Sequence, residues 1–197
     1  MFRIVGIVVF SFVLSCSLDA VALQNPHLTV VVHNDARVPA QVIQAAEGIT
    51  ERIYREAGIV LVWRDHIGLA PDSNELSVRI VPRSLNLPGE DFGIAFVGTD
   101  GRGVQADIFY SGIARLADNS AVKPAELLGH VMAHELGHLL LGMNSHSSLG
   151  IMQAHWADRQ LRQMSTGALK FEKRQAATMG ARLLDISPRI VAEVRGN

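Results

Sequence analysis

Two histidines and a glutamate in the second half of the chain have the types and the spacing of a metal-dependent hydrolytic centre. His134 and His138 are four residues apart. On a helix they lie on one face, roughly 6 Å apart along the axis, so both imidazoles can reach one ion. Glu135 projects beside them and can take a proton from a metal-bound water without being a ligand. This H-E-x-x-H arrangement predicts a zinc site that performs hydrolysis.

The segment that carries these residues predicts a helix that runs through the interior of the protein. It is expected from about Pro124 to Gly142, and over residues 127–142 (LLGHVMAHELGHLLLG) its apolar side chains fall on nearly every side of a helix. A buried carboxylate beside imidazoles is costly without compensation, and a bound cation would supply it. Without a metal, His134 and His138 would be hydrogen-bonded core histidines. His130 lies one turn earlier and is expected to have a structural role, outside the metal ligands.

A third ligand is needed, because catalytic zinc usually takes three protein ligands and a water. His146 is the leading candidate. Gly142 can end the helix, and residues 143–145 are long enough for the chain to fold back and present the His146 side chain. The remaining candidates for this position are Asn144, His155 and Glu172.

Residues 134–152 (HELGHLLLGMNSHSSLGIM) resemble the metzincin clan of zinc peptidases, and most closely its matrixin-like branch. The clan motif is H-E-x-x-H-x-x-G-x-x-H followed by a methionine turn. The resemblance implies three zinc ligands, which are His134, His138 and His146. It also implies that Glu135 acts as general base and acid, and that Met152 forms an apolar floor beneath the metal. The implied activity is hydrolysis of peptide bonds, with Zn²⁺ as the cofactor and a peptide or protein as the substrate.

The spacing to the third histidine differs from the clan motif. Glycine stands one residue later, at Gly142, and the histidine stands two residues later, so that Asn144 occupies the clan's ligand position. Met152 nevertheless follows His134 by eighteen positions, as in the matrixin pattern. We therefore expect a rearranged link before His146.

The elements around the helix predict one α+β domain over residues 23–197. A helix is expected at residues 38–57, and two more in the C-terminal part, about residues 157–197. Strands are expected at residues 27–33, 59–63, 76–81, 93–97 and 104–110. The glycine-rich link 98–103 suits an antiparallel hairpin between the last two strands. The resemblance implies a metzincin-like (zincin) fold: a mixed twisted sheet, a backing helix, a central active-site helix and C-terminal helices.

The same resemblance implies that residues 93–97 bind substrate. In metzincins the strand nearest the site pairs with extended substrate, and this segment (GIAFV) would offer backbone groups suited to such pairing. An ordinary sheet strand is the alternative.

The first 22 residues have the pattern of a secretory signal peptide. Arg3 precedes an apolar run over residues 4–14, and Ala20-Val21-Ala22 suits cleavage. The run is shorter than the roughly 20 residues that a membrane-spanning helix needs, so no stable membrane span is expected. Residues 13–16 also match a lipobox loosely, in which case Cys16 would carry a lipid anchor. Both patterns predict an extracytoplasmic protein, secreted or periplasmic.

Composition limits the other classes of function. The chain has 197 residues, 48% of them hydrophobic, which is enough for a buried core. A formal net charge of -1 disfavours general nucleic-acid binding by counterion release. The alternative to a peptidase is a non-catalytic extracytoplasmic binding domain that holds zinc on the same scaffold.

Overall fold

The structure is a computed structural model that describes residues 25–64, 75–83 and 92–186. The predicted signal peptide and Cys16 lie outside the described residues. Within the described part of the chain, no helix is both long enough and apolar enough to cross a membrane.

Five strands form one mixed sheet in the order β2-β1-β3-β5-β4. The strands are β1 (His27–Asn34), β2 (Val60–Arg64), β3 (Glu75–Val81), β4 (Gly93–Ala95) and β5 (Gln105–Phe109). The first four strands in this order are parallel, and β4 runs antiparallel to β5 at the edge. The predicted hairpin and mixed sheet are therefore confirmed. β4 is shorter than predicted because the Val97 N–H bonds to Ala95 O, 3.1 Å away in its own segment.

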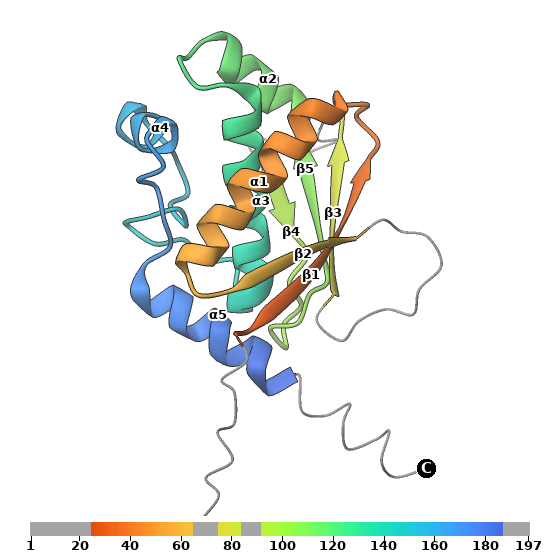
Figure 1. The fold of residues 1–197 in the computed structure, drawn as a ribbon, viewed down its shortest axis with the longest axis vertical. Helices are drawn as coiled ribbons and strands as arrows, with labels where there is room; N and C mark the ends of the chain where they lie inside the picture. The colour runs from red at the N-terminus through yellow and green to blue at the C-terminus, as the bar shows by residue number, and fades with distance from the viewer. Residues whose placement is uncertain (1–24, 65–74, 84–91, 187–197) are drawn as a thin grey trace, which may run out of the picture.

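Two long helices, α1 (Ala40–Glu56) and α3 (Pro124–Leu141), lie side by side on one face of the sheet (Figure 1). They approach closely at Gly129, where an added Cβ would lie 2.7 Å from Ala46 O. Thr50 Oγ1 donates to Gly129 O at 3.0 Å, and Tyr54 Oη donates to Ala133 O at 3.1 Å. Helix α1 therefore holds α3 through hydrogen bonds as well as apolar contact.

Helix α3 is the interior helix that the sequence predicts. Every side chain from Leu127 to Leu140 is buried. Pro124 opens the first turn, where its missing N–H costs nothing, and Glu126 Oε2 accepts the Lys123 N–H at 3.2 Å. Gly142 follows the last turn in the left-handed conformation, with φ +69°, which glycine adopts without a steric penalty.

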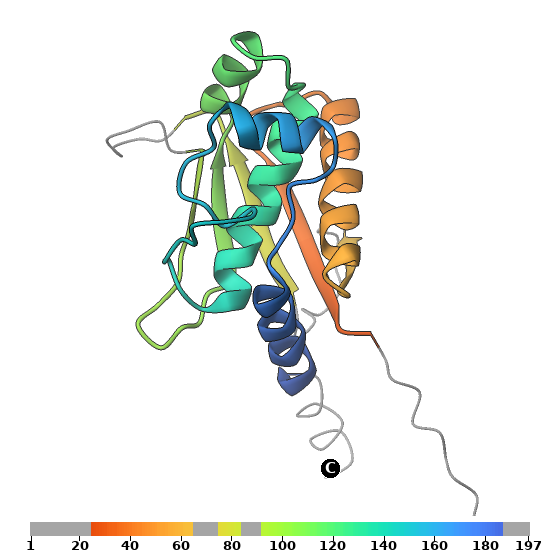
Figure 2. The same ribbon diagram turned by 90° about the vertical axis from the view of Figure 1, so that its left-hand side faces the viewer.

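Three shorter helices complete the described fold: α2 (Tyr110–Asp118), α4 (Asp158–Ser165) and α5 (Lys173–Ile186). Helices α4 and α5 confirm the two predicted C-terminal helices. Helix α5 lies beyond the C-terminal end of α3 (Figures 1 and 2). Helix α2 is absent from the predicted elements, and Tyr110, predicted as the last residue of a strand, begins this helix. The chain passes from β5 into α2 at Tyr110 with no intervening turn residue, so no glycine or proline marks the boundary.

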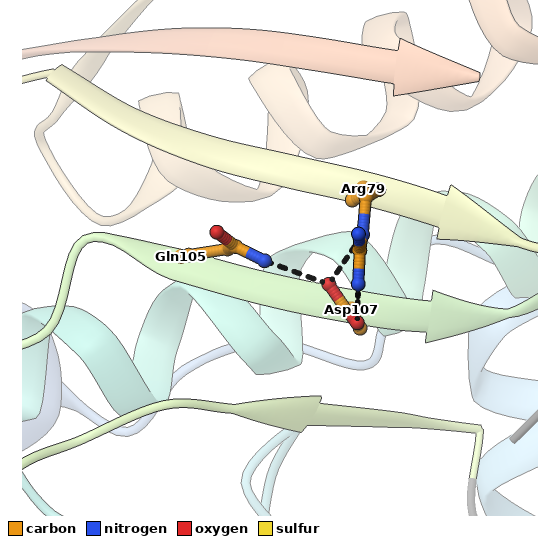
Figure 3. A network of polar contacts seen from close by, with 3 residues as sticks. All are labelled: Arg79, Gln105 and Asp107. Atoms are coloured by element: carbon orange, nitrogen blue, oxygen red, sulfur yellow. Dashed lines mark hydrogen bonds and ion pairs between the residues drawn. The ribbon is translucent and has the colours of Figure 1, made fainter. Parts of the chain in front are cut away.

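The opposite face of the sheet is polar in its centre. Leu76, Val78 and Ile80 of β3 are buried, and Arg79 alternates with them. Figure 3 shows Arg79, Gln105 and Asp107 together on the face turned away from the helices. Arg79 binds the Asp107 carboxylate through Nη2 at 2.6 Å and Nε at 3.1 Å, and Gln105 Nε2 donates to Asp107 Oδ1 at 3.1 Å. This bidentate pair joins β3 to β5 and compensates the burial of Asp107.

Candidate zinc site

Three histidines come together beside α3. His134 and His138 lie on the helix, and His146 lies on the segment that follows it; one nitrogen from each ring lies within 4.8 Å of the other two. The Nε2 atoms of His134 and His138 are 3.0 Å apart. The His146 ring stacks on His134 at 5.3 Å between centroids and meets His138 edge-on at 4.9 Å. Two nitrogens that bind one tetrahedral zinc at about 2.0–2.1 Å are roughly 3.3 Å apart, so the cluster has the size for one ion.

Backbone carbonyls fix the tautomers of the two helical histidines. His134 Nδ1 donates to Ile151 O at 2.8 Å, and His138 Nδ1 donates to Met143 O at 2.9 Å. A carbonyl oxygen can only accept, so the neutral rings carry their hydrogen on Nδ1 and a lone pair on Nε2. Two lone pairs that face each other at 3.0 Å repel unless a proton or a cation lies between them. This donor set fits a metal ion.

Burial keeps both histidines in the form that binds metal. Desolvation, together with the neighbouring His138 and His146, lowers the pKa of His134 to about 4, although the hydrogen bond to Ile151 O opposes the shift. Desolvation also lowers the pKa of His138, with a contribution from His146. At neutral pH both rings are therefore neutral, as a metal ligand must be.

The Glu135 side chain extends from α3 to the edge strand β4. Its side chain is buried, and a Cβ added to Gly93 of β4 would lie 2.7 Å from Glu135 Oε1 and 2.8 Å from its Cγ and Cδ. The carboxylate therefore packs directly on the backbone of the edge strand, where only glycine leaves room. Sequence reasoning did not identify Gly93, because no local pattern links it to Glu135.

Met152 packs against α3 at Gly137. It is buried, and its Sδ lies 2.7 Å from the position that a Cβ on Gly137 would occupy. The Phe171 ring crowds the same position at 2.9 Å. The Ser147 N–H bonds to Met152 O at 2.8 Å and closes the turn that leads to the methionine. Met152 therefore packs against α3 at Gly137, next to His138 in the chain, and its role as an apolar floor beneath the metal stays a prediction.

Trp156 is a further neighbour of the site. Its ring meets His134 edge-on, with centroids 5.5 Å apart and planes at 88°. Its Nε1 donates to Ile151 O at 3.3 Å, the carbonyl that also accepts from His134. Trp156 is not identified from the sequence, because no spacing pattern links this tryptophan to the histidines.

Three other residues were candidates for the third ligand: Asn144, His155 and Glu172. Among the histidine, cysteine, aspartate and glutamate residues that the structure describes, the cluster contains His146 and neither His155 nor Glu172. Asn144, His155 and His146 are all exposed, so His146 is distinguished by its ring contacts with His134 and His138 and not by burial. His130 is buried outside the cluster, with Nδ1 donating to Glu126 O at 2.7 Å, in agreement with a structural role.

The comparisons with known proteins give matches among solved structures. No family model matches the sequence, and no curated protein matches it. Archaemetzincin from Methanopyrus kandleri is 16% identical with a TM-score of 0.55, over 83% of this chain and 99% of that one. A zinc-dependent peptidase from Methanocorpusculum labreanum is 14% identical with a TM-score of 0.50, over 76% of this chain and 99% of that one. The predicted α+β fold with a mixed sheet is confirmed and is similar to the folds of these two proteins, and the matrixin-like branch stays a prediction.

Proposed function

We propose that this protein is an extracytoplasmic zinc-dependent endopeptidase. One observation carries the proposal: a three-histidine cluster lies beside the buried Glu135, whose carboxylate packs on Gly93 of the edge strand. The similarity of the fold to archaemetzincin and to a zinc-dependent peptidase supports it.

The chain would divide the reaction between ligands and a proton carrier. His134, His138 and His146 would hold Zn²⁺, which lowers the pKa of a water to about 7 and polarises the scissile carbonyl. The Glu135 carboxylate accepts a proton from the attacking water. It then donates that proton to the amine nitrogen that leaves, which completes hydrolysis of the peptide bond. Its position against β4 keeps the carboxylate in place for both transfers.

The edge strand suits an extended substrate. β4 ends the strand order, and none of the described strands pairs with it on the side away from β5. An extended peptide can add to such an edge through main-chain hydrogen bonds, which would bring a bond within its interior next to Glu135. This arrangement favours an endopeptidase.

The extracytoplasmic location rests on residues 1–22, whose pattern is that of a signal peptide. Mass spectrometry of the mature N-terminus tests it. Cleavage after Ala22 supports secretion to the periplasm or medium, whereas a lipidated Cys16 supports an anchored lipoprotein.

The test of activity compares the parent with Glu135→Gln on a mixture of diverse peptides, with products identified by mass spectrometry. Glutamine fills the same space but cannot accept the proton, so we expect cleavage to fall at least about 100-fold while zinc content stays at one ion per chain. Zinc-loaded parent without Glu135-dependent cleavage would favour the alternative, a non-catalytic zinc-binding domain.

A further inference from the structure

The carbonyl of Ile151 accepts two hydrogen bonds that meet at the candidate zinc site. One comes from His134 Nδ1 at 2.8 Å and the other from Trp156 Nε1 at 3.3 Å. The Ile151 N–H in turn donates to Lys170 O at 2.9 Å, so this peptide unit is fixed on both sides. Trp156 and His134 are thus joined through one rigid acceptor.

The Trp156 indole also contacts the histidine ring itself. The two rings are nearly perpendicular, at 88°, with centroids 5.5 Å apart. Trp156 is half-buried, and His134 is buried. An edge-on aromatic contact of this kind restricts rotation of the imidazole about its Cβ–Cγ bond.

A chain of hydrogen bonds holds the segment that carries the tryptophan. Gln153 Nε2 donates to Gly150 O at 2.8 Å, and Gln153 Oε1 accepts from Gln160 Nε2 at 3.2 Å. Gln160 Oε1 accepts the Ala157 N–H at 3.2 Å at the start of α4. Gln153 precedes Trp156 and Gln160 follows it in α4, so their hydrogen bonds hold the segment on both sides of the tryptophan. We call this hydrogen-bonded pair the Gln153–Gln160 brace.

We propose that Trp156 is a positioning residue for the zinc ligand His134, held in place by the Gln153–Gln160 brace. This inference rests on one part of the proposed function, the binding of zinc by the three histidines, and does not depend on peptide cleavage. The indole N–H orients the Ile151 carbonyl, which holds His134 Nδ1 and directs Nε2 toward the cluster, and the indole ring limits how far the imidazole can turn. Partners of this kind around a metal ligand affect metal affinity by roughly 10- to 100-fold.

The test measures the rate at which a chelator removes zinc from the full mature chain. Trp156→Phe keeps an aromatic ring and removes the N–H, and we expect zinc to leave about tenfold faster. Trp63→Phe is the matched control, because Trp63 binds Glu51 through Nε1 on another part of the fold; it should release zinc at the parent's rate. The visible absorption spectrum of the cobalt-loaded proteins provides a second readout, with altered bands expected for Trp156→Phe alone.

A Trp156→Phe variant that releases zinc within twofold of the parent rate, with an unchanged cobalt spectrum, overturns the proposal. If that variant does not fold, Gln160→Leu decides, because it keeps every group that touches His134 and Ile151 and removes the brace. Faster release from Gln160→Leu supports the proposal, and an unchanged rate overturns it. A parent that binds zinc but cleaves no peptide removes the proposed function and leaves this inference intact.

Discussion

At the scale of single residues, the site depends on two glycines at positions where no larger side chain fits. Gly93 and Gly137 each face an atom within 3 Å of the place where a side chain would begin, and these atoms belong to Glu135 and Met152. Small residues therefore set the distance between the helix and its surroundings.

The first prediction concerns Gly93→Ala. The new methyl group would overlap the Glu135 side chain, which is easier to displace than the backbone, so the carboxylate moves and the histidines do not. We expect kcat to fall by about 10- to 100-fold with unchanged zinc content. Gly48→Ala in α1 is the control, since its Cβ meets nothing within 4 Å; peptide cleavage should keep the parent rate. Equal kcat values for Gly93→Ala and the parent would contradict the placement of Glu135.

The second prediction concerns the third ligand. His146→Ala should weaken zinc binding by more than the roughly 100-fold that loss of a supporting group can cause, because a direct ligand is removed. His155→Ala is the control, since His155 is exposed and lies outside the cluster. Competition with a chromophoric chelator measures both affinities. Equal affinities for the two variants would assign the third ligand to another residue.

At the scale of elements, the sequence predicts the helices and strands better than their ends. The apolar pattern of α3 and the β-branched runs identify the interior helix and the sheet, because burial decides both. Helix α2 was missed because residues 110–118 continue from a strand without a turn signal. The C-terminal end of α3, unlike the start of α2, is predictable. Gly142 marks it in the sequence and adopts φ +69° in the structure.

The third prediction concerns this helix end. Gly142→Ala incurs the cost of a left-handed backbone, about 1–2 kcal/mol, and also brings the new Cβ against Arg182 and Gly101. Gly167→Ala has the same φ of +69° but no atom within 4 Å, so it incurs the backbone cost alone. Urea unfolding of metal-free protein should show a larger loss for Gly142→Ala, by about 1–3 kcal/mol. Equal losses would show that the Arg182 contact does not constrain this end.

At the scale of the whole molecule, a buried histidine outside the cluster affects stability. His130 is 2% exposed, and its Nε2 has no hydrogen-bond partner in the described part of the structure. Burial lowers its pKa below the usual 6.5, with Glu126 opposing and Arg52 adding to the shift. Below about pH 6.5 the unfolded chain binds a proton that the folded chain excludes, so stability is lost as the pH falls and is retained above this value.

The fourth prediction follows from that difference. In metal-free protein, the free energy of unfolding should fall less steeply below pH 6.5 for His130→Gln than for the parent, by up to about 1.4 kcal/mol per pH unit. Denaturant unfolding at several pH values between about 7.5 and 4.5 measures the two slopes. Parallel profiles would mean that His130 is protonated as easily in the folded chain as in the unfolded one.

The candidate site was predictable where its residues are close in sequence. His134, Glu135, His138 and His146 lie within one short stretch, so spacing and the helix stop at Gly142 were enough to propose them together. The contact of Gly93 with Glu135 depends on how the sheet edge meets α3. The shared carbonyl of Ile151 depends on the path of the loop, and neither arrangement leaves a local pattern.

Hydrolysis of peptide bonds by this protein is expected to need both one bound zinc ion and the Glu135 carboxylate. The most direct measurement adds zinc stepwise to metal-free parent and Glu135→Gln, and follows bound zinc and cleavage of a peptide substrate in the same samples. The account predicts that both proteins bind one equivalent and that cleavage rises to a plateau at that point in the parent alone. Cleavage without bound zinc, or equal cleavage by Glu135→Gln, would contradict it.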